Sequence, residues 1–230
     1  VLWQAAATTT GVCFTYRSVD GEQGYPGDLD VSVTLSLMGD SLGYHYQAIS
    51  NRDTIINLTN HTYFNLDGAA TGDGDIRNHE LQIAAGAYLP IDTEVLPTGE
   101  IKAVADTAFD FSQSANIGSR LALGDEQLSL GLGFDHCFVL NQTTNSDDDG
   151  ALAQPVASLY SPDSGIVLEI FTSEPGLQFY TGNYLPTPHA GLCLETQHFP
   201  DSPNMPHFPS TRLAAGAVFD STSIYRFTAK

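Results

Sequence analysis

Positive charge is scarce in this sequence. Its 230 residues include 8 Lys and Arg against 27 Asp and Glu, which leaves a formal net charge of −19 at pH 7. A chain this acidic is repelled by phosphate backbones and by anionic membrane surfaces, so nucleic acid and membranes are poor partners. The few cations are scattered rather than clustered as phosphate recognition requires. The charge pattern therefore favours an uncharged ligand.

Long apolar runs are also absent. The sequence contains no stretch of about 18 apolar residues and no charged-then-apolar leader, so it predicts neither a membrane span nor a signal peptide. It begins at Val1-Leu2-Trp3 without an initiating Met, and these residues are typical of the interior of a strand. We therefore expect either a processed chain or a piece of a longer one.

Cysteines are few and odd in number. Cys13, Cys137 and Cys193 lie far apart, each among apolar residues, which predicts three buried free thiols and leaves a single disulfide as the alternative. No CxxC or HExxH motif occurs, so we expect no dedicated zinc site and no metal.

Two features bear on the cellular compartment. The free thiols and the lack of a leader favour a cytoplasmic location. A secreted glycoprotein is the alternative, because the sequence contains three N-glycosylation tripeptides, Asn57-Leu58-Thr59, Asn60-His61-Thr62 and Asn141-Gln142-Thr143.

Alternation of apolar and polar residues dominates the pattern and predicts an all-β fold. Residues 31–37 alternate cleanly, end at Gly39-Asp40 and are followed by a second run at 44–48, which predicts a hairpin. The length suits one domain over residues 1–230. Further strands are expected at 11–16, 55–59, 81–84, 138–140, 156–160, 166–172, 177–181, 217–219 and 223–228.

Helix signals are thin. Residues 117–123, introduced by 112–116, predict one short helix, and no long amphipathic stretch exists. Clusters of Gly, Pro and Asp predict loops at 20–28, 67–75, 145–150 and 186–189. The acidic Asp147-Asp148-Asp149-Gly150 tip lacks the alternating spacing of a calcium loop and is interpreted as a solvated turn.

Three segments place ionisable residues among strand formers. In the first, NLTNHTYFNL, a strand would put His61 and Tyr63 on one face, and an imidazole can hold or release a proton near neutrality. In the second, GLGFDHCF, Asp135 is either a functional carboxylate or a loop cap. A structural, hydrogen-bonded role is the alternative for His61.

The third segment pairs PGLQFYTGN with GLCLETQ and contains Gln178 and Glu195. Burying Glu195 beside Leu194 and Cys193 raises the pKa of its carboxyl and costs free energy unless the group is paired or used. Glu195 and His61 are therefore the best candidates for a proton-transferring pair.

These segments resemble the aldose 1-epimerases, the galactose mutarotases. The blocks NLTNHTYFNL, LPIDTEVLPTGEI followed by TAFDF, GFDHCFVL, PGLQFYTGNYL and CLETQHFPDSPN are similar to those of the family and occur in its order over nearly all of the chain. The resemblance implies a galactose mutarotase-like antiparallel β-sandwich, or supersandwich. It also implies an aldohexose such as glucose or galactose as substrate, with neither metal nor nucleotide cofactor.

The resemblance carries roles to particular residues. His61 falls on the family's general acid and Glu195 on its general base. Asp135 matches a residue that holds sugar hydroxyls, and Gln178 matches a further ligand contact. Thr62 and Tyr63 neighbour the acid and are expected to line the same cleft, whereas His79 and His136 are expected to be structural.

The match departs from the family at the start of the chain. The family's N-terminal part carries an HGG loop and another His and Arg that contact the sugar, and none of these is in this sequence. Either another segment or a second chain completes the cleft, or activity is weak or lost. The two alternative functions are a phosphosugar 1-epimerase and a non-catalytic carbohydrate-binding module of the same fold.

Overall fold

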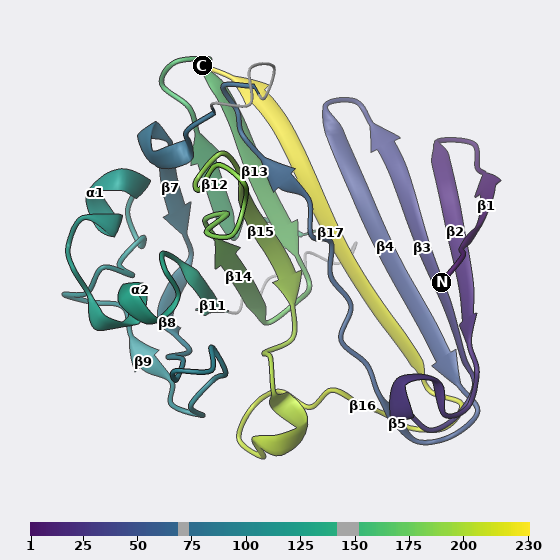
Figure 1. Cartoon of the computed structure of the whole chain (residues 1–230). Coiled ribbons are helices and arrows are strands. Elements are labelled where there is room, and N and C mark those ends of the chain that lie inside the picture. Colours follow the sequence, from purple (N-terminus) through teal and green to yellow (C-terminus); the bar gives the residue numbers. More distant parts are fainter. Residues whose placement is uncertain (69–73, 142–151) are drawn as a thin grey trace.

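Two antiparallel sheets pack against each other in the computed structural model, which describes residues 1–68, 74–141 and 152–230 (Figure 1). Every pair of neighbouring strands in them is antiparallel, as the alternation predicts. The larger sheet has the order β1 (Gln4–Ala7), β2 (Gly11–Ser18), β3 (Leu29–Met38), β4 (Ser41–Ser50), β17 (Val218–Ala229), β13 (Ile166–Thr172), β12 (Ala157–Tyr160), β7 (Glu80–Ile83) and β10 (Ala115–Asn116).

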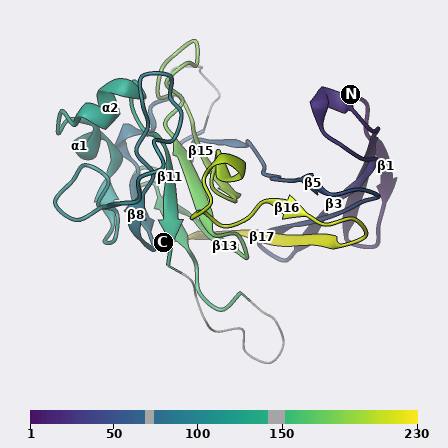
Figure 2. The same cartoon turned by 90° about the horizontal axis from the view of Figure 1, so that it is seen from below.

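The smaller sheet lies over one end of the larger one. Its order is β6 (Tyr63–Phe64), β15 (Leu192–Gln197), β14 (Gly176–Tyr180), β11 (Asp135–Leu140), β8 (Ala85–Tyr88) and β9 (Lys102–Ala103). A two-stranded sheet of β16 (Arg212–Leu213) and β5 (Thr54–Ile55) completes the set. From below, strands β1 to β3 extend well beyond the smaller sheet (Figure 2).

Among the residues that the structure describes, helical structure is confined to short segments. They are α1 (Ile117–Leu121), α2 (Glu126–Leu130) and the 3-10 turns η1 (Glu22–Gly24), η2 (Ile76–Asn78) and η3 (Ser202–Asn204). The predicted helix is α1, whereas α2 was not predicted; Asp125 caps it by accepting a hydrogen bond from the Gln127 amide at 2.8 Å. Within the described ranges, no helix is long and apolar enough to cross a bilayer.

Most predicted strands are present, with two differences. The strand expected at 55–59 stops at Ile55, because the Asn57 side chain bonds the backbone of His198 instead. Asn57 Nδ2 donates to the His198 carbonyl, and Asn57 Oδ1 accepts from the His198 amide, both at 3.0 Å. The two strands expected near the end form one strand, β17. Its polar centre continues the strand because Ser223 is buried and bonds Thr196 (2.7 Å) and Thr172 (2.9 Å). The loops predicted at 67–75 and 145–150, including the Asp147-Asp148-Asp149-Gly150 tip, lie partly or wholly outside the described residues.

The core between the two sheets is rich in aromatic rings. Tyr88 on β8 stacks on Phe109 with ring centroids 3.9 Å apart, and Phe134 stacks on Phe179 of β14 at 5.0 Å. Phe109 also meets Phe134 edge to face at 5.3 Å, so the two stacks form one buried layer. This layer supports the inner face of the smaller sheet and leaves its outer face free.

Replacing Phe109 by Ala should lower the free energy of unfolding by about 3–5 kcal/mol, because the ring is fully buried and its removal leaves a cavity. Urea denaturation followed by circular dichroism measures the change. Leu123→Ala is the control: Leu123 is 60% exposed, so its loss should change the free energy by less than about 0.5 kcal/mol. Equal effects of the two substitutions would contradict the role given to the aromatic layer.

Candidate active site

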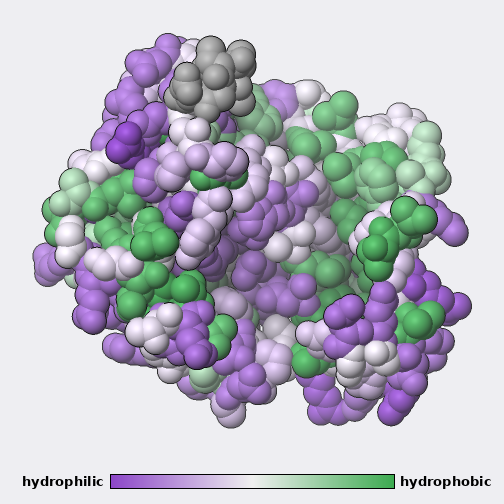
Figure 3. All heavy atoms as spheres, in the orientation of Figure 1, coloured by the Kyte–Doolittle hydropathy of each residue, from purple (hydrophilic) through white to green (hydrophobic). Residues whose placement is uncertain are grey.

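A cleft of about 610 Å³ opens on the outer face of the smaller sheet. Side chains of β11, β14 and β15 alternate, so Leu177, Phe179 and Leu194 enter the core while their neighbours face the cleft. In the orientation of Figure 1, hydrophilic side chains gather in the hollow in front of this sheet (Figure 3). The cleft is lined by His61, Tyr63, Leu89, Ile91, Val95, Leu96, Pro97, Asp135, Cys137, Gln178, Tyr180, Tyr184, Glu195, Gln197, Pro200 and Asp201.

Strand register arranges the polar side chains in two rows across the sheet. In one row Cys137 pairs with Gln178 and Gln178 pairs with Glu195. In the other, residues run in the order Asp135, Tyr180, Cys193, Tyr63. Directly opposite residues in antiparallel strands have Cβ atoms about 4.5–5.5 Å apart, so residues from four separate parts of the sequence become immediate neighbours.

His61 and Glu195 meet at the centre of this surface. His61 Nε2 lies 3.6 Å from Glu195 Oε1, with the imidazole 53% exposed and the carboxylate side chain 9% exposed. The sequence predicts His61 in a strand, but it lies just before β6. There, Asn60 Oδ1 accepts a hydrogen bond from the Thr62 amide at 3.1 Å. Its ring packs against Tyr63 and Tyr180 at centroid distances of 5.1 and 6.1 Å.

Two carboxyl groups of the cleft, Glu195 and Asp135, are less acidic than usual. Burial raises the pKa of Glu195, the His61 charge opposes this, and the Asp135 charge raises it further. Burial also raises the pKa of Asp135, while the hydrogen bond from Gln178 Nε2 to Asp135 Oδ1, 2.8 Å long, opposes the rise. A carboxylate with a raised pKa is a stronger base than an exposed one, which suits Glu195 to removing a proton.

Asp135 enters the cleft because of the turn before it. Gly133 has φ +139°, and a Cβ there would lie 2.4 Å from Asn183 Oδ1 and 2.7 Å from Thr181 Oγ1. Only glycine fits such a position. The turn is then held by the Phe134 amide, which donates to Thr181 Oγ1 at 3.0 Å.

Five of the six predicted site residues line the cleft: His61, Tyr63, Asp135, Gln178 and Glu195. Thr62 is the exception. It is not part of the lining, and its hydroxyl donates to Asn60 Oδ1 instead, so cleft geometry gives no support to a substrate contact by Thr62.

The two histidines expected to be structural are buried in the described core. His79 Nε2 accepts from the Leu66 amide at 3.0 Å. His136 is enclosed so completely that burial lowers its pKa to about 3.

Sequence reasoning missed the cleft positions of Cys193, Gln197 and Asp201. For the first two a signal existed, because residues two apart in a strand share a face and both stand two positions from Glu195. All three cysteines are free, as expected. Cys137 and Cys193 are buried, but Cys13 on β2 is only half-buried, which corrects the expectation of three buried thiols.

The cleft also contains a set of metal-ligating atoms. One atom each of His61, Cys193 and Glu195 lies within 4.8 Å of the other two, and in the described part of the chain no other such group occurs. Ligand atoms around a tetrahedral zinc lie closer, roughly 3.3–3.8 Å apart, given zinc–ligand bonds of 2.0–2.3 Å. The three residues therefore offer suitable atoms without a preformed metal geometry.

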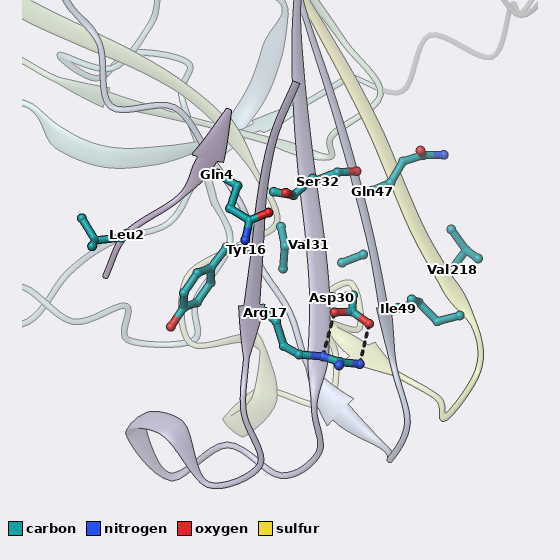
Figure 4. A pocket seen from close by; sticks show the side chains of 12 residues that line it. Leu2, Gln4, Tyr16, Arg17, Asp30, Val31, Ser32, Gln47, Ile49 and Val218 are labelled. Carbon is teal, nitrogen blue, oxygen red and sulfur yellow. Dashed lines mark hydrogen bonds and ion pairs between the residues drawn. The ribbon is translucent and has the colours of Figure 1, made fainter. Parts of the chain in front are cut away.

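A second, larger hollow of about 840 Å³ lies on the exposed face of strands β1 to β4 (Figure 4). Its charged lining residues, Arg17 and Asp30, bind each other in a two-pronged pair at 2.9 and 3.0 Å. The lining brings no imidazole and carboxylate together, as the cleft does with His61 and Glu195.

The sandwich with an acid–base cleft on the smaller sheet is a galactose mutarotase-like fold. Among solved structures, the GalM/aldose epimerase homologue from C. elegans has a TM-score of 0.86 at 27% identity, over 99% of this chain and 68% of that one. The galactose 1-epimerase from Lactobacillus acidophilus NCFM has a TM-score of 0.84 at 30% identity, over 99% and 66%.

The chain belongs to the aldose 1-epimerase family, whose model matches residues 1–226. It is 41% identical to the galactose mutarotase of Mus musculus over 99% of its own length and 66% of that relative's. It is 43% identical to the aldose 1-epimerase of Haemophilus influenzae over 86% and 58%. The chain thus spans just under two thirds of the length of the mammalian relatives it matches. The family and fold predicted from the motifs are confirmed.

Glu195→Gln should stabilise the protein at pH 8 and lose that advantage near pH 4. Because the pKa of Glu195 is higher in the folded than in the unfolded chain, the folded chain binds more protons between the two values, and stability falls as pH rises through that window. Glutamine resembles the neutral acid at every pH. Thermal unfolding of both proteins from pH 4 to pH 8 measures the difference.

Glu94→Gln, which changes an exposed carboxylate, is the matched control and should show no such trend. A Glu195→Gln protein that is less stable than the unsubstituted chain at pH 8 would contradict the raised pKa.

Proposed function

We propose that this chain is an aldose 1-epimerase that interconverts the α and β anomers of an aldohexose such as glucose or galactose. The observation that carries the proposal is the 3.6 Å separation of His61 Nε2 and Glu195 Oε1 at the centre of the cleft. The names of the relatives, galactose mutarotase and aldose 1-epimerase, support the same reaction.

The reaction needs one base and one acid. A cyclic aldose is a hemiacetal, and its ring opens when the C1 hydroxyl loses a proton while the ring oxygen gains one. Glu195 takes the hydroxyl proton, and protonated His61 delivers a proton from Nε2 to the ring oxygen as the bond between C1 and that oxygen breaks. Both oxygens are attached to C1, so two groups 3.6 Å apart can reach them together.

Closing the ring reverses both transfers. Rotation about the C1–C2 bond presents the other face of the open aldehyde. Glu195 then returns its proton to the carbonyl oxygen while His61 removes the proton from the attacking hydroxyl. The two residues end in their starting states, so no metal, nucleotide or redox partner is consumed.

Asp135 and Gln178 orient the sugar. Asp135 accepts hydrogen bonds from ring hydroxyls. Gln178 Oε1 is buried and has no partner among the described residues, so a donor such as a bound hydroxyl or water would offset its desolvation. Tyr63 and Tyr184, 44% and 65% exposed at the cleft, offer ring faces to the apolar side of the sugar.

The cleft favours an uncharged sugar over a phosphorylated one. Its lining includes the acids Asp135, Glu195 and Asp201 but neither Lys nor Arg. A phosphate would meet negative charge without the bidentate donors that usually bind it. This observation disfavours a phosphosugar 1-epimerase.

A cytoplasmic location is a further proposal. The three cysteines are free, which fits a reducing compartment. Asn57 uses its amide for two bonds to His198, and Asn60 is half-buried beside the cleft, so glycans at these two positions would displace existing contacts.

The intact chain should accelerate the change in optical rotation of freshly dissolved α-D-glucose or α-D-galactose over the buffer rate. His61→Asn and Glu195→Gln should each reduce the acceleration about 10²-fold or more, because each removes one of the two proton-transfer groups, while sugar binding stays measurable by calorimetry. Polarimetry provides the rate.

His45→Asn and Glu94→Gln are matched controls, since His45 is half-buried, Glu94 is exposed, and both lie outside the cleft. Sugar binding without any acceleration by the unsubstituted chain would identify a carbohydrate-binding module and refute the enzyme. Wild-type rates in either cleft variant would refute the assigned roles.

The pH profile should show the raised pKa of Glu195. Activity on the acid side should fall with an apparent pKa above the ordinary value of about 4.3, because burial keeps Glu195 protonated to higher pH. Asp135→Asn should move this limb to lower pH, since it removes a negative charge that raises the Glu195 pKa. A limb that stays in place in this variant would show that the Asp135 charge does not act on the pair.

A further inference from the structure

We infer that Cys193 is a positioning residue for His61: its sulfur accepts the Nδ1 hydrogen of the imidazole and so makes Nε2 the atom that transfers protons. The inference deepens the proposed function and rests on it. It assigns to a buried cysteine a part in the reaction that the acid–base pair alone does not explain.

The geometry places the imidazole between two neighbours on one strand. Cys193 Sγ lies 3.4 Å from His61 Nδ1, while Glu195 Oε1 lies 3.6 Å from Nε2. Cys193 and Glu195 are two residues apart on β15 and therefore face the same side. Across the described ranges, Nδ1 has no hydrogen-bonding partner other than this sulfur.

The sulfur is held in place from both sides. Cys193 pairs with Tyr180 on β14 and with Tyr63 on β6, and both tyrosine rings pack against the imidazole. Cys193 and the two tyrosines all contact the imidazole of His61, and these contacts oppose a flip of the ring. Because Cys193 is fully buried, no water competes with the imidazole for its sulfur.

The thiol stays neutral in this environment. Burial raises the pKa of Cys193, and the charges of Glu195 and Asp135 raise it further. A neutral thiol is a weak acceptor through its sulfur. It is therefore neither a nucleophile nor a second negative charge that would bind the imidazolium tightly and hinder release of its proton.

Proton transfer needs a partner on Nδ1. When His61 delivers the Nε2 proton to the ring oxygen, the neutral ring that remains carries its hydrogen on Nδ1, and Nε2 presents a lone pair for the reverse step. The same Nδ1 hydrogen is present when a single proton is shared between His61 and Glu195, on either side of the pair. An acceptor at Nδ1 thus stabilises the Nδ1-protonated imidazole in every step of the reaction, as the orienting partner of a catalytic histidine does.

Three variants separate this role from simple packing. Cys193→Ala removes the acceptor, and Cys193→Ser keeps an atom that both accepts and donates. Cys13→Ala is the control, because Cys13 is on β2 and outside the cleft. Polarimetric kcat and KM, and ¹⁵N NMR of the histidine side chains, are measured for each, with thermal unfolding as a check that each variant folds.

Cys193→Ala should lower kcat about tenfold or more with little change in KM, as expected when the orienting partner of a functional histidine is lost. In the NMR spectra the neutral His61 should carry its hydrogen on Nδ1 in the unsubstituted chain and shift toward Nε2 in this variant. Cys193→Ser should restore the Nδ1 form and most of kcat, and Cys13→Ala should match the unsubstituted chain.

A neutral His61 protonated on Nε2 in the unsubstituted chain would overturn the inference. So would unchanged kcat and tautomer in Cys193→Ala, or an equal loss in Cys193→Ser, which would indicate a packing effect. The tautomer is read without turnover, so a chain that fails to accelerate mutarotation refutes the proposed function and still leaves the NMR result to decide the role of Cys193.

Discussion

The register of β11, β14, β15 and β6 is the constraint on which the rest of the site depends. It sets Glu195 beside Gln178 and Cys193 between Tyr180 and Tyr63, so that one strand contributes partners to both nitrogens of His61. A shift by one residue would turn every one of these side chains into the core. The aromatic layer beneath the sheet opposes such a shift, because Phe179 and Leu194 fill the opposite face.

Burial then tunes the chemistry of the groups that the register brings together. Glu195 and Asp135 are removed from water, so the pKa of each carboxyl is raised. The Asp135 charge raises the pKa of Glu195 further, while Gln178 and His61 limit the rise. The same environment keeps the Cys193 thiol neutral. Sheet packing therefore produces two weakly acidic carboxyl groups and a neutral, weakly accepting thiol from side chains that in water would behave in the ordinary way.

Much of the fold follows from local pattern. The alternation at 31–37 and 44–48 corresponds to β3 and β4, and the short helix at Ile117 is α1. The local pattern predicted the wrong strand ends where side-chain hydrogen bonds interrupted a strand or kept it continuous. Asn57 ends β5 early by bonding His198, and the buried hydroxyl of Ser223 carries β17 through a polar stretch that looked like a break.

The sequence by itself determined the kinds of group available: an acidic chain, His61 among polar strand formers, and Glu195 two residues after Cys193. Only the tertiary structure decided that His61 meets both of them, and that Thr62 bonds Asn60 and stays outside the cleft lining. The reason is that His61 and Cys193 are 132 residues apart, and a distance between such segments depends on how separate strands pair and pack.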